Sequence, residues 1–164
     1  MKVCKFGGTS MANEECIKRV RDIIAADEQV AYVVVSAPGK REKSDTKVTD
    51  LLYACFDDVN AGKSPVDAFA PVKERFDSII KGLGLTMDLS DEYTEIENRL
   101  AAGATKDYIA SRGEYLSAIV LAGALGWKFV DAADFVRFDD NGNFLADETN
   151  TYARALFHHT CPLV

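Results

Sequence analysis

The pattern of hydrophobic and polar residues predicts a βαβ unit at the start of the chain. Short apolar runs at residues 2–5 and 30–36 predict two strands. The second run is apolar and β-branched almost throughout, which is typical of a strand buried on both faces in a parallel sheet. Between the runs, apolar residues recur at helical spacing and predict a helix at about residues 12–26. Such a unit should have a right-handed crossover.

Helical spacing dominates the middle of the chain. It predicts four successive helices: one that begins at residue 46 or 49, then residues 66–83, 90–102 and 105–125. Because so many consecutive helices cannot each cross between neighbouring strands, we expect a helical insertion packed over the sheet edge. The remaining pattern predicts a strand at 127–130, a hairpin turn at residues 141–142, a helix at about 149–159 and a strand beginning at 162–164. The expected fold class is α/β with a mainly parallel central sheet.

Composition narrows the class of protein. The 164 residues fit one domain, and a hydrophobic content of 48% can build a core. The net charge of −7 argues against a nucleic-acid partner. Because no apolar run has membrane-spanning length and no signal-peptide pattern begins the chain, we expect a cytoplasmic protein without a membrane partner. The scattered cysteines form no C-x-x-C pair and should be free thiols: Cys4, Cys16, Cys55 and Cys161.

The first predicted strand runs into a loop that could bind an anion. The loop consists of Lys5, Phe6, Gly7, Gly8, Thr9 and Ser10. Adjacent glycines let a ligand approach the backbone closely, and a helix that begins directly after them would point free N–H groups at a phosphate. Since Gly-Gly pairs also form ordinary turns and Thr-Ser is a common helix cap, a plain turn is the alternative.

A second unusual stretch interrupts the helix predicted at residues 105–125. Residues 111–118 read Ser-Arg-Gly-Glu-Tyr-Leu-Ser-Ala. Gly113 costs a helix about 1 kcal/mol relative to alanine, a cost often tolerated where something must pack or bind closely. We expect Glu114 to face inward, where its carboxylate needs a partner such as Arg112, Lys5 or a ligand amine. An ordinary ion pair on the helix surface is the alternative.

Two charged loops carry weaker indications of binding. The basic loop at residues 37–45 follows a central strand and could contact phosphate or carboxylate, but Lys40, Arg41 and Lys43 are each expected to be solvated surface charges. The acidic stretch at 139–143 lacks the glycine position and the terminal glutamate of an EF-hand. We therefore expect a hairpin there and no metal site in the chain.

Together these stretches resemble the aspartate kinases of the amino acid kinase superfamily. The matching stretches, in order, are residues 5–10, 33–37, 49–52, 111–118 and 126–134. The resemblance covers essentially the whole chain and implies a three-layer αβα fold with a helical insertion. It also implies transfer of the γ-phosphoryl group of ATP, with Mg²⁺, to the side-chain carboxylate of L-aspartate. That reaction is the first step of lysine, threonine and methionine biosynthesis.

The resemblance implies a role for each matching residue. Lys5 would bind and neutralise the transferring phosphoryl group. The loop that holds the nucleotide phosphates would consist of Lys5, Phe6, Gly7, Gly8, Thr9 and Ser10. Thr49 would contact aspartate, Glu114 would bind its α-amino group, and Ser36 would border the substrate. Because family members usually associate, a homo-oligomer is also expected.

The 164 residues do not include several parts of the family pattern. The family's glycine-rich R-G-G-S-D loop, nucleotide-binding half and regulatory ACT domains do not occur among them. We therefore expect residues 1–164 to be the substrate-binding part of an incomplete catalytic domain, with little or no kinase activity by itself. Two alternatives stay open: a non-catalytic amino-acid-binding or interaction module of the same fold, and another carboxylate kinase of the superfamily.

Overall fold

A small parallel sheet organises the chain. The computed structural model describes residues 1–157 and 162–164. Strands β1 (Lys2–Phe6) and β2 (Val30–Val35) pair in parallel, and helix α1 (Glu14–Ala25) connects them, so the predicted βαβ unit is confirmed. Leu163 forms parallel bridges to both Tyr32 and Lys128. The strands predicted at 127–130 and 162–164 are thus present only as single bridges that extend the sheet beyond β2.

Helices make up most of the rest of the described chain. They are α2 (Val48–Asn60), α3 (Pro65–Leu83), α4 (Ser90–Ala101), α5 (Lys106–Leu125) and α6 (Ala146–Leu156), with short 3-10 helices at Gly8–Met11 and Ala132–Asp134. The four helices predicted between residues 46 and 125 are confirmed. Helix α6 begins three residues before its predicted start, and the predicted end at residue 159 lies outside the described residues, as does Cys161. No helix in the described ranges is long and apolar enough to cross a membrane.

The predicted hairpin also forms. Phe138 and Phe144 make an antiparallel bridge, and their rings pack edge to face. Gly142 has a φ of +81°, a backbone conformation that glycine adopts without strain. The Asp139 carboxylate accepts hydrogen bonds from the backbone N–H groups of Asn141 and Asn143, so its acidic side chain stabilises the turn.

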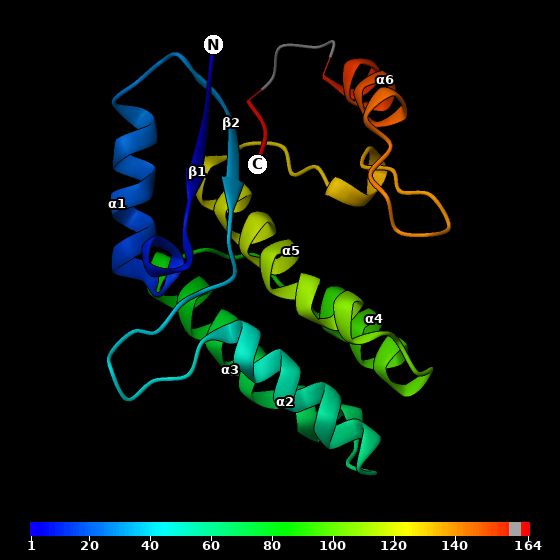
Figure 1. Ribbon diagram of the computed structural model, residues 1–164. Coiled ribbons are helices and arrows are strands. Elements are labelled where there is room, and N and C mark those ends of the chain that lie inside the picture. Colours follow the sequence, from blue (N-terminus) through cyan, green and yellow to red (C-terminus); the bar gives the residue numbers. More distant parts are fainter. Residues whose placement is uncertain (158–161) are drawn as a thin grey trace.

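The hydrophobic core lies between one face of the sheet and the helices. Cys4 and Phe6 of β1 pair with Val33 and Val35 of β2, and all four side chains join the core cluster. Helices α1, α2, α3 and α5 contribute most of the other buried residues. Figure 1 shows α2 to α5 gathered beyond the carboxyl ends of the two strands. The helical insertion therefore shares one core with the sheet.

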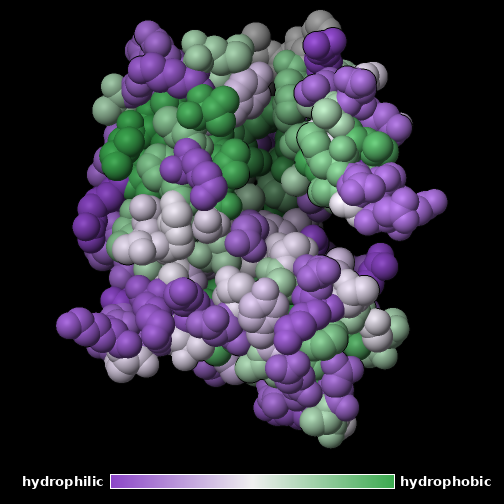
Figure 2. Space-filling model, in the orientation of Figure 1, coloured by the Kyte–Doolittle hydropathy of each residue, from purple (hydrophilic) through white to green (hydrophobic). Residues whose placement is uncertain are grey.

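The opposite face of the sheet is largely open. Val3 and Val34 on this face are 67% and 50% exposed, so the prediction that the second strand is buried on both faces is wrong for Val34. The reason is that Val34 borders a cavity instead of packing against another element, whereas Tyr32 on the same face is half-buried, with its ring against Phe157 just after α6. A cavity of about 680 Å³ lies beside β2, between the sheet, α5 and the 129–138 segment. Figure 2 shows apolar side chains gathered over this face and the hollow beside it.

Candidate functional site

The glycine loop at the end of β1 (residues 5–10, the β1 loop) lies against the loop between β2 and α2 (residues 36–47, the β2 loop). The Ser36 N–H donates to the Phe6 carbonyl (3.1 Å), and the Gly39 N–H donates to the Gly8 carbonyl (2.8 Å). A Cβ atom added to Gly8 would lie 2.8 Å from the Ala37 carbonyl oxygen, and one added to Gly39 would lie 2.8 Å from the Gly8 backbone. Because both positions exclude a side chain, these two glycines allow the β1 and β2 loops to touch.

The two glycines of the β1 loop differ in what surrounds them. Gly8 packs against protein backbone, whereas a Cβ atom added to Gly7 would meet nothing within 4 Å. The backbone at Gly7 is therefore the part of the loop that a ligand can approach. Gly8 is explained by the approach of Gly39, which the sequence did not predict.

The α-helix expected directly after this loop does not begin there. A 3-10 helix occupies Gly8–Met11, where the Ser10 N–H donates to the Gly7 carbonyl. The α1 helix begins only at Glu14, capped by the Asn13 side chain on the Cys16 N–H. Met11 is fully buried, which fixes this turn in the core before the helix starts. The α-helix therefore begins two residues after its predicted start at about residue 12, and a 3-10 turn connects it to the glycine loop.

Lys5 and Thr9 present their side chains to solvent at this end of the sheet. Lys5 pairs in register with Val34 and so lies on the open face. It is exposed and makes no ion pair with any residue in the described ranges. Thr9 is exposed and Ser10 is half-buried. The loop thus combines a free cation with hydroxyl groups and an accessible backbone.

Thr49 reaches the same region from α2. It lies in the first turn of this helix and is half-buried. The preceding Val48 N–H donates to the Pro38 carbonyl in the β2 loop (3.0 Å). The start of α2 is therefore fixed to the loop that contacts Gly8.

Helix α5 meets the β2 loop at Gly113. A Cβ atom there would lie 2.7 Å from the Ala37 Cβ atom and 3.1 Å from the Leu52 Cδ1 atom. The expectation of a close approach at this glycine is confirmed, and the partner is protein. Any side chain at Gly113 would push α5 away from both the β2 loop and α2.

Glu114 does not face the core as predicted. Gly113, Leu116 and Val120 occupy the buried stripe of α5, so the neighbouring Glu114 lies to one side of it and is exposed. Its side chain lines the 680 Å³ cavity beside β2 and makes no ion pair with the described residues. The pairings with Arg112 or Lys5 are therefore absent from the described part of the chain.

The Arg112 guanidinium has other partners. It lies 4.5 Å from the ring centres of both Tyr108 and Tyr115 and donates hydrogen bonds to the Ser111 hydroxyl. Stacking between two rings holds it along the surface of α5. This arrangement leaves the Glu114 carboxylate available to a ligand amine.

The structure thus brings the segments that carry the predicted site residues together at the carboxyl ends of the strands. The β1 loop contacts Gly39, the β2 loop contacts Gly113 through Ala37, and α2 begins at Pro38. These contacts connect the segments that carry Lys5, Ser36, Thr49 and Glu114. In residues 1–157 and 162–164, no group of three or more acidic, histidine or cysteine side chains could hold a metal ion.

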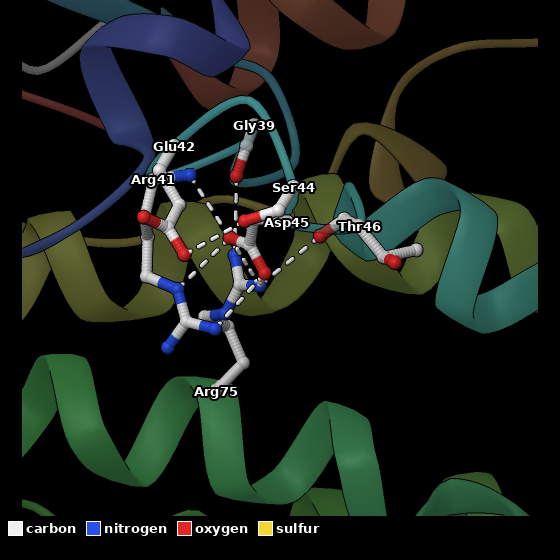
Figure 3. Close-up of polar contacts among 7 residues, drawn as sticks. All are labelled: Gly39, Arg41, Glu42, Ser44, Asp45, Thr46 and Arg75. Carbon is white, nitrogen blue, oxygen red and sulfur yellow. Dashed lines mark hydrogen bonds and ion pairs between the residues drawn. The ribbon is translucent and has the colours of Figure 1, made fainter.

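One buried charge beside this site was missed. Arg75 of α3 is 4% exposed, and its guanidinium donates to the Gly39 and Thr46 carbonyls (3.1 and 3.0 Å) and to both carboxylate oxygens of Asp45 (2.8 Å each). Arg41 donates to the same carboxylate with two nitrogens (2.9 Å each), as Figure 3 shows. The Arg41 hydrogen bonds hold the pKa of the Asp45 carboxyl well below its usual range.

The sequence carried an indication of this residue. Arg75 stands between Val72 and Ile79 at helical spacing, on the apolar stripe of its helix. A charge on such a stripe needs a partner inside the protein. Asp45 is the partner of Arg75, and it also pairs with Arg41. Arg41 therefore belongs to a structural ion pair in the loop.

Comparisons with known proteins identify the family of this chain. The whole chain, residues 1–164, matches the amino acid kinase family. It is 34% identical over 154 residues to aspartokinase 3 of Bacillus subtilis, covering 90% of this chain and 34% of that protein.

Two solved structures have a similar fold. The aspartate kinase of Clostridium acetobutylicum superposes with a TM-score of 0.91 at 37% identity, over 98% of this chain and 37% of that one. The E. coli aspartokinase III in complex with aspartate and ADP superposes with a TM-score of 0.71 at 22% identity, over 95% of this chain and 37% of that one. The chain thus spans about a third of the length of these relatives. The expected αβα amino acid kinase fold is confirmed, and the chain belongs to the amino acid kinase family.

Proposed function

We propose that this chain forms the aspartate- and phosphoryl-binding part of an aspartate kinase. The reaction would transfer the γ-phosphoryl group of ATP to the side-chain carboxylate of L-aspartate. The observation that carries the proposal is the convergence of the β1 loop, the β2 loop, the start of α2 and the middle of α5 at one sheet edge. Ligands of open α/β sheets bind at such carboxyl edges. The similarity to aspartokinases supports the choice of substrate.

The phosphoryl end of the site would be the β1 loop. Phosphoryl transfer depends mainly on positioning and on neutralising negative charge. Lys5 is an exposed ammonium without a partner in the described residues, and Gly7 leaves the adjacent backbone open. We assign Lys5 to the transferring phosphoryl group and Gly7, Thr9 and Ser10 to phosphate oxygens. Phe6 and Gly8 would act indirectly, by holding this loop against the β2 loop.

The aspartate end would lie beside the first turn of α2 and the middle of α5, next to the cavity that Glu114 lines. Glu114 is a free carboxylate on the cavity wall and suits the α-amino group of the substrate. Thr49 and Ser36 would supply hydroxyl groups to the substrate. The side-chain carboxylate of aspartate would then point toward Lys5.

The adenosine part of the nucleotide would need more than the described residues, whereas its phosphates would contact the β1 loop. The E. coli aspartokinase of the same fold is in complex with ADP, which supports ATP as the phosphoryl donor. The described residues do not form a metal site, so Mg²⁺ would be carried chiefly by the phosphates of ATP. We propose that residues 1–164 are the amino-terminal part of the catalytic domain and that this part alone has little or no kinase activity. Self-association stays a prediction, to be measured by sedimentation.

Isothermal titration of the chain with aspartate and with ATP–Mg²⁺ tests the proposal. Lys5→Ala should weaken ATP–Mg²⁺ binding about tenfold or more, because a charge-assisted contact to phosphate is worth about 1.5–3 kcal/mol. Glu114→Gln should weaken aspartate binding by a similar factor. Lys2→Ala is the matched control at the other end of β1 and should change neither affinity.

The alternatives predict different results. Aspartate binding without any nucleotide binding, indifferent to Lys5, would indicate a non-catalytic amino-acid-binding module. A preference for another amino acid in the same titration would indicate a different carboxylate kinase. Failure of the wild-type chain to bind either ligand would refute the proposed site.

A further inference from the structure

One buried guanidinium holds both ends of the loop between β2 and α2. Arg75 donates to the Gly39 carbonyl near the start of this loop and to the Thr46 carbonyl near its end. It also donates to both carboxylate oxygens of Asp45 (2.8 Å each). Figure 3 shows the side chain rising from α3 into the middle of the loop. The planar fork of arginine suits such a divided set of acceptors, which a lysine could not satisfy together.

Each end of this loop continues into a part of the proposed site. At the start, the Gly39 N–H donates to the Gly8 carbonyl in the β1 loop (2.8 Å). At the end, Thr46 lies three residues before Thr49. The position of Arg75 is therefore transmitted to the phosphoryl end through Gly39 and to the aspartate end through Thr46.

Contacts within the loop hold its local turn but do not tie it to a helix or strand: the Asp45 N–H donates to the Glu42 carbonyl, and the Arg41 backbone N–H donates to the Asp45 carboxylate. Residues 40–44 are all exposed and belong to no helix or strand. The Arg75 side chain is only 4% exposed, and Asp45 is the partner of its buried charge, so Arg75 cannot leave Asp45 without a large cost. Moving the loop would separate this pair. The Arg75–Asp45 ion pair thus anchors this exposed loop to α3.

We propose that Arg75 is a positioning residue that holds the glycine loop and Thr49 at the spacing the site requires. This inference rests on the proposed function of the site but names a residue that touches neither substrate. Arg75 acts through Gly39 and Thr46. Arg41 shares the Asp45 carboxylate but contacts neither of these carbonyls, so it is not part of this device.

The comparison of Arg75→Met with Arg41→Met tests the proposal. Each change removes one guanidinium from Asp45 and keeps an unbranched side chain, but only the first releases Gly39 and Thr46. We expect Arg75→Met to shift or broaden the amide NMR signals of Gly8 and Thr49. It should also weaken aspartate and ATP–Mg²⁺ binding about tenfold or more, because small displacements of positioning groups are costly. Arg41→Met should leave those signals unchanged and should keep both affinities within about threefold of wild type.

A measurement on the wild-type chain covers the case in which Arg75→Met does not fold. The guanidinium N–H protons of Arg75 should be protected from hydrogen exchange, because they are buried and bonded to Gly39, Asp45 and Thr46, whereas those of the exposed Arg21 should exchange freely. Equal exchange at the two arginines overturns the proposal, as does a folded Arg75→Met chain with unchanged Gly8 and Thr49 signals. If the wild type binds neither ligand, the proposed function fails while the amide signals and exchange still decide the role of Arg75.

Discussion

Replacement of Gly113 by alanine isolates the steric contact that joins α5 to the β2 loop. The new Cβ atom would lie 2.7 Å from the Ala37 Cβ atom, well inside ordinary van der Waals distance. Ala37 is buried and its Cβ atom is fixed to the backbone, so it cannot rotate away. The helix or the loop must move.

The magnitude follows from two opposing effects. Alanine improves the helix by about 1 kcal/mol relative to glycine. Overpacking of a close contact costs about 1–3 kcal/mol. We therefore expect Gly113→Ala to lower the free energy of unfolding by about 0–2 kcal/mol.

A control in the same helix removes the uncertain helix contribution. Gly123 also lies in α5, but there the Cβ atom would meet the flexible side chain of Met87, with its sulfur at 3.1 Å. Gly123→Ala gains the same helix propensity while Met87 can change rotamer. The difference between the two variants therefore reports the contact with Ala37 and should be about 1–3 kcal/mol.

Urea unfolding followed by far-ultraviolet circular dichroism measures this difference. For a chain of this length, each 1 kcal/mol should also shift the midpoint of thermal unfolding by about 2–4 °C. A Gly113→Ala chain as stable as the Gly123→Ala chain would show that α5 does not press on the loop. In that case the convergence on which the proposed site depends would lose its main support.

Two further predictions concern titratable groups. Burial raises the pKa of the Cys55 thiol to about 11, so at pH 8 Cys55 in the native protein should resist iodoacetamide. Peptide mapping measures the labelling, with the half-buried Cys16 as the comparison. Labelling of both cysteines at the same rate would contradict this prediction. The Arg41 hydrogen bonds lower the pKa of Asp45 below its ordinary value of 3.8. The stability that the ionised Asp45 carboxylate contributes to the fold should therefore be complete above about pH 4 and decline as the pH falls further. Urea unfolding at pH 2.5–6 should show the advantage of wild type over Asp45→Asn shrinking below about pH 4, and an advantage independent of pH would count against the ion pair.

Periodicity predicted the helices well because their apolar stripes face one common core. Ile17, Val20 and Ile24 of α1 are buried as their spacing requires. The same reasoning overestimated the sheet. Val34 looks like a central-strand residue in the sequence, yet its burial depends on what covers the second face, which local spacing does not specify.

The site was only partly predictable for a similar reason. The motifs identified the segments of the site. The orientation of Glu114, however, depends on which side of α5 packs against the β2 loop, and the contact between Gly113 and Ala37 determines that side. Arg75 was missed because its partner, Asp45, lies 30 residues earlier in the sequence. The local sequence indicates such a long-range pair only by a charged residue that interrupts an apolar stripe.

Stability and binding should separate cleanly between two groups of residues in this site. Gly8 and Gly113 are required by contacts between protein segments, so their substitution must disturb folding and ligand affinity together. Lys5 and Glu114 are exposed and make no ion pairs with the described residues, and surface substitutions of this kind usually change stability by less than about 0.5 kcal/mol. Because nothing in the described protein requires a charge at either position, a loss of affinity on their substitution, with unfolding unchanged, can only reflect the ligand.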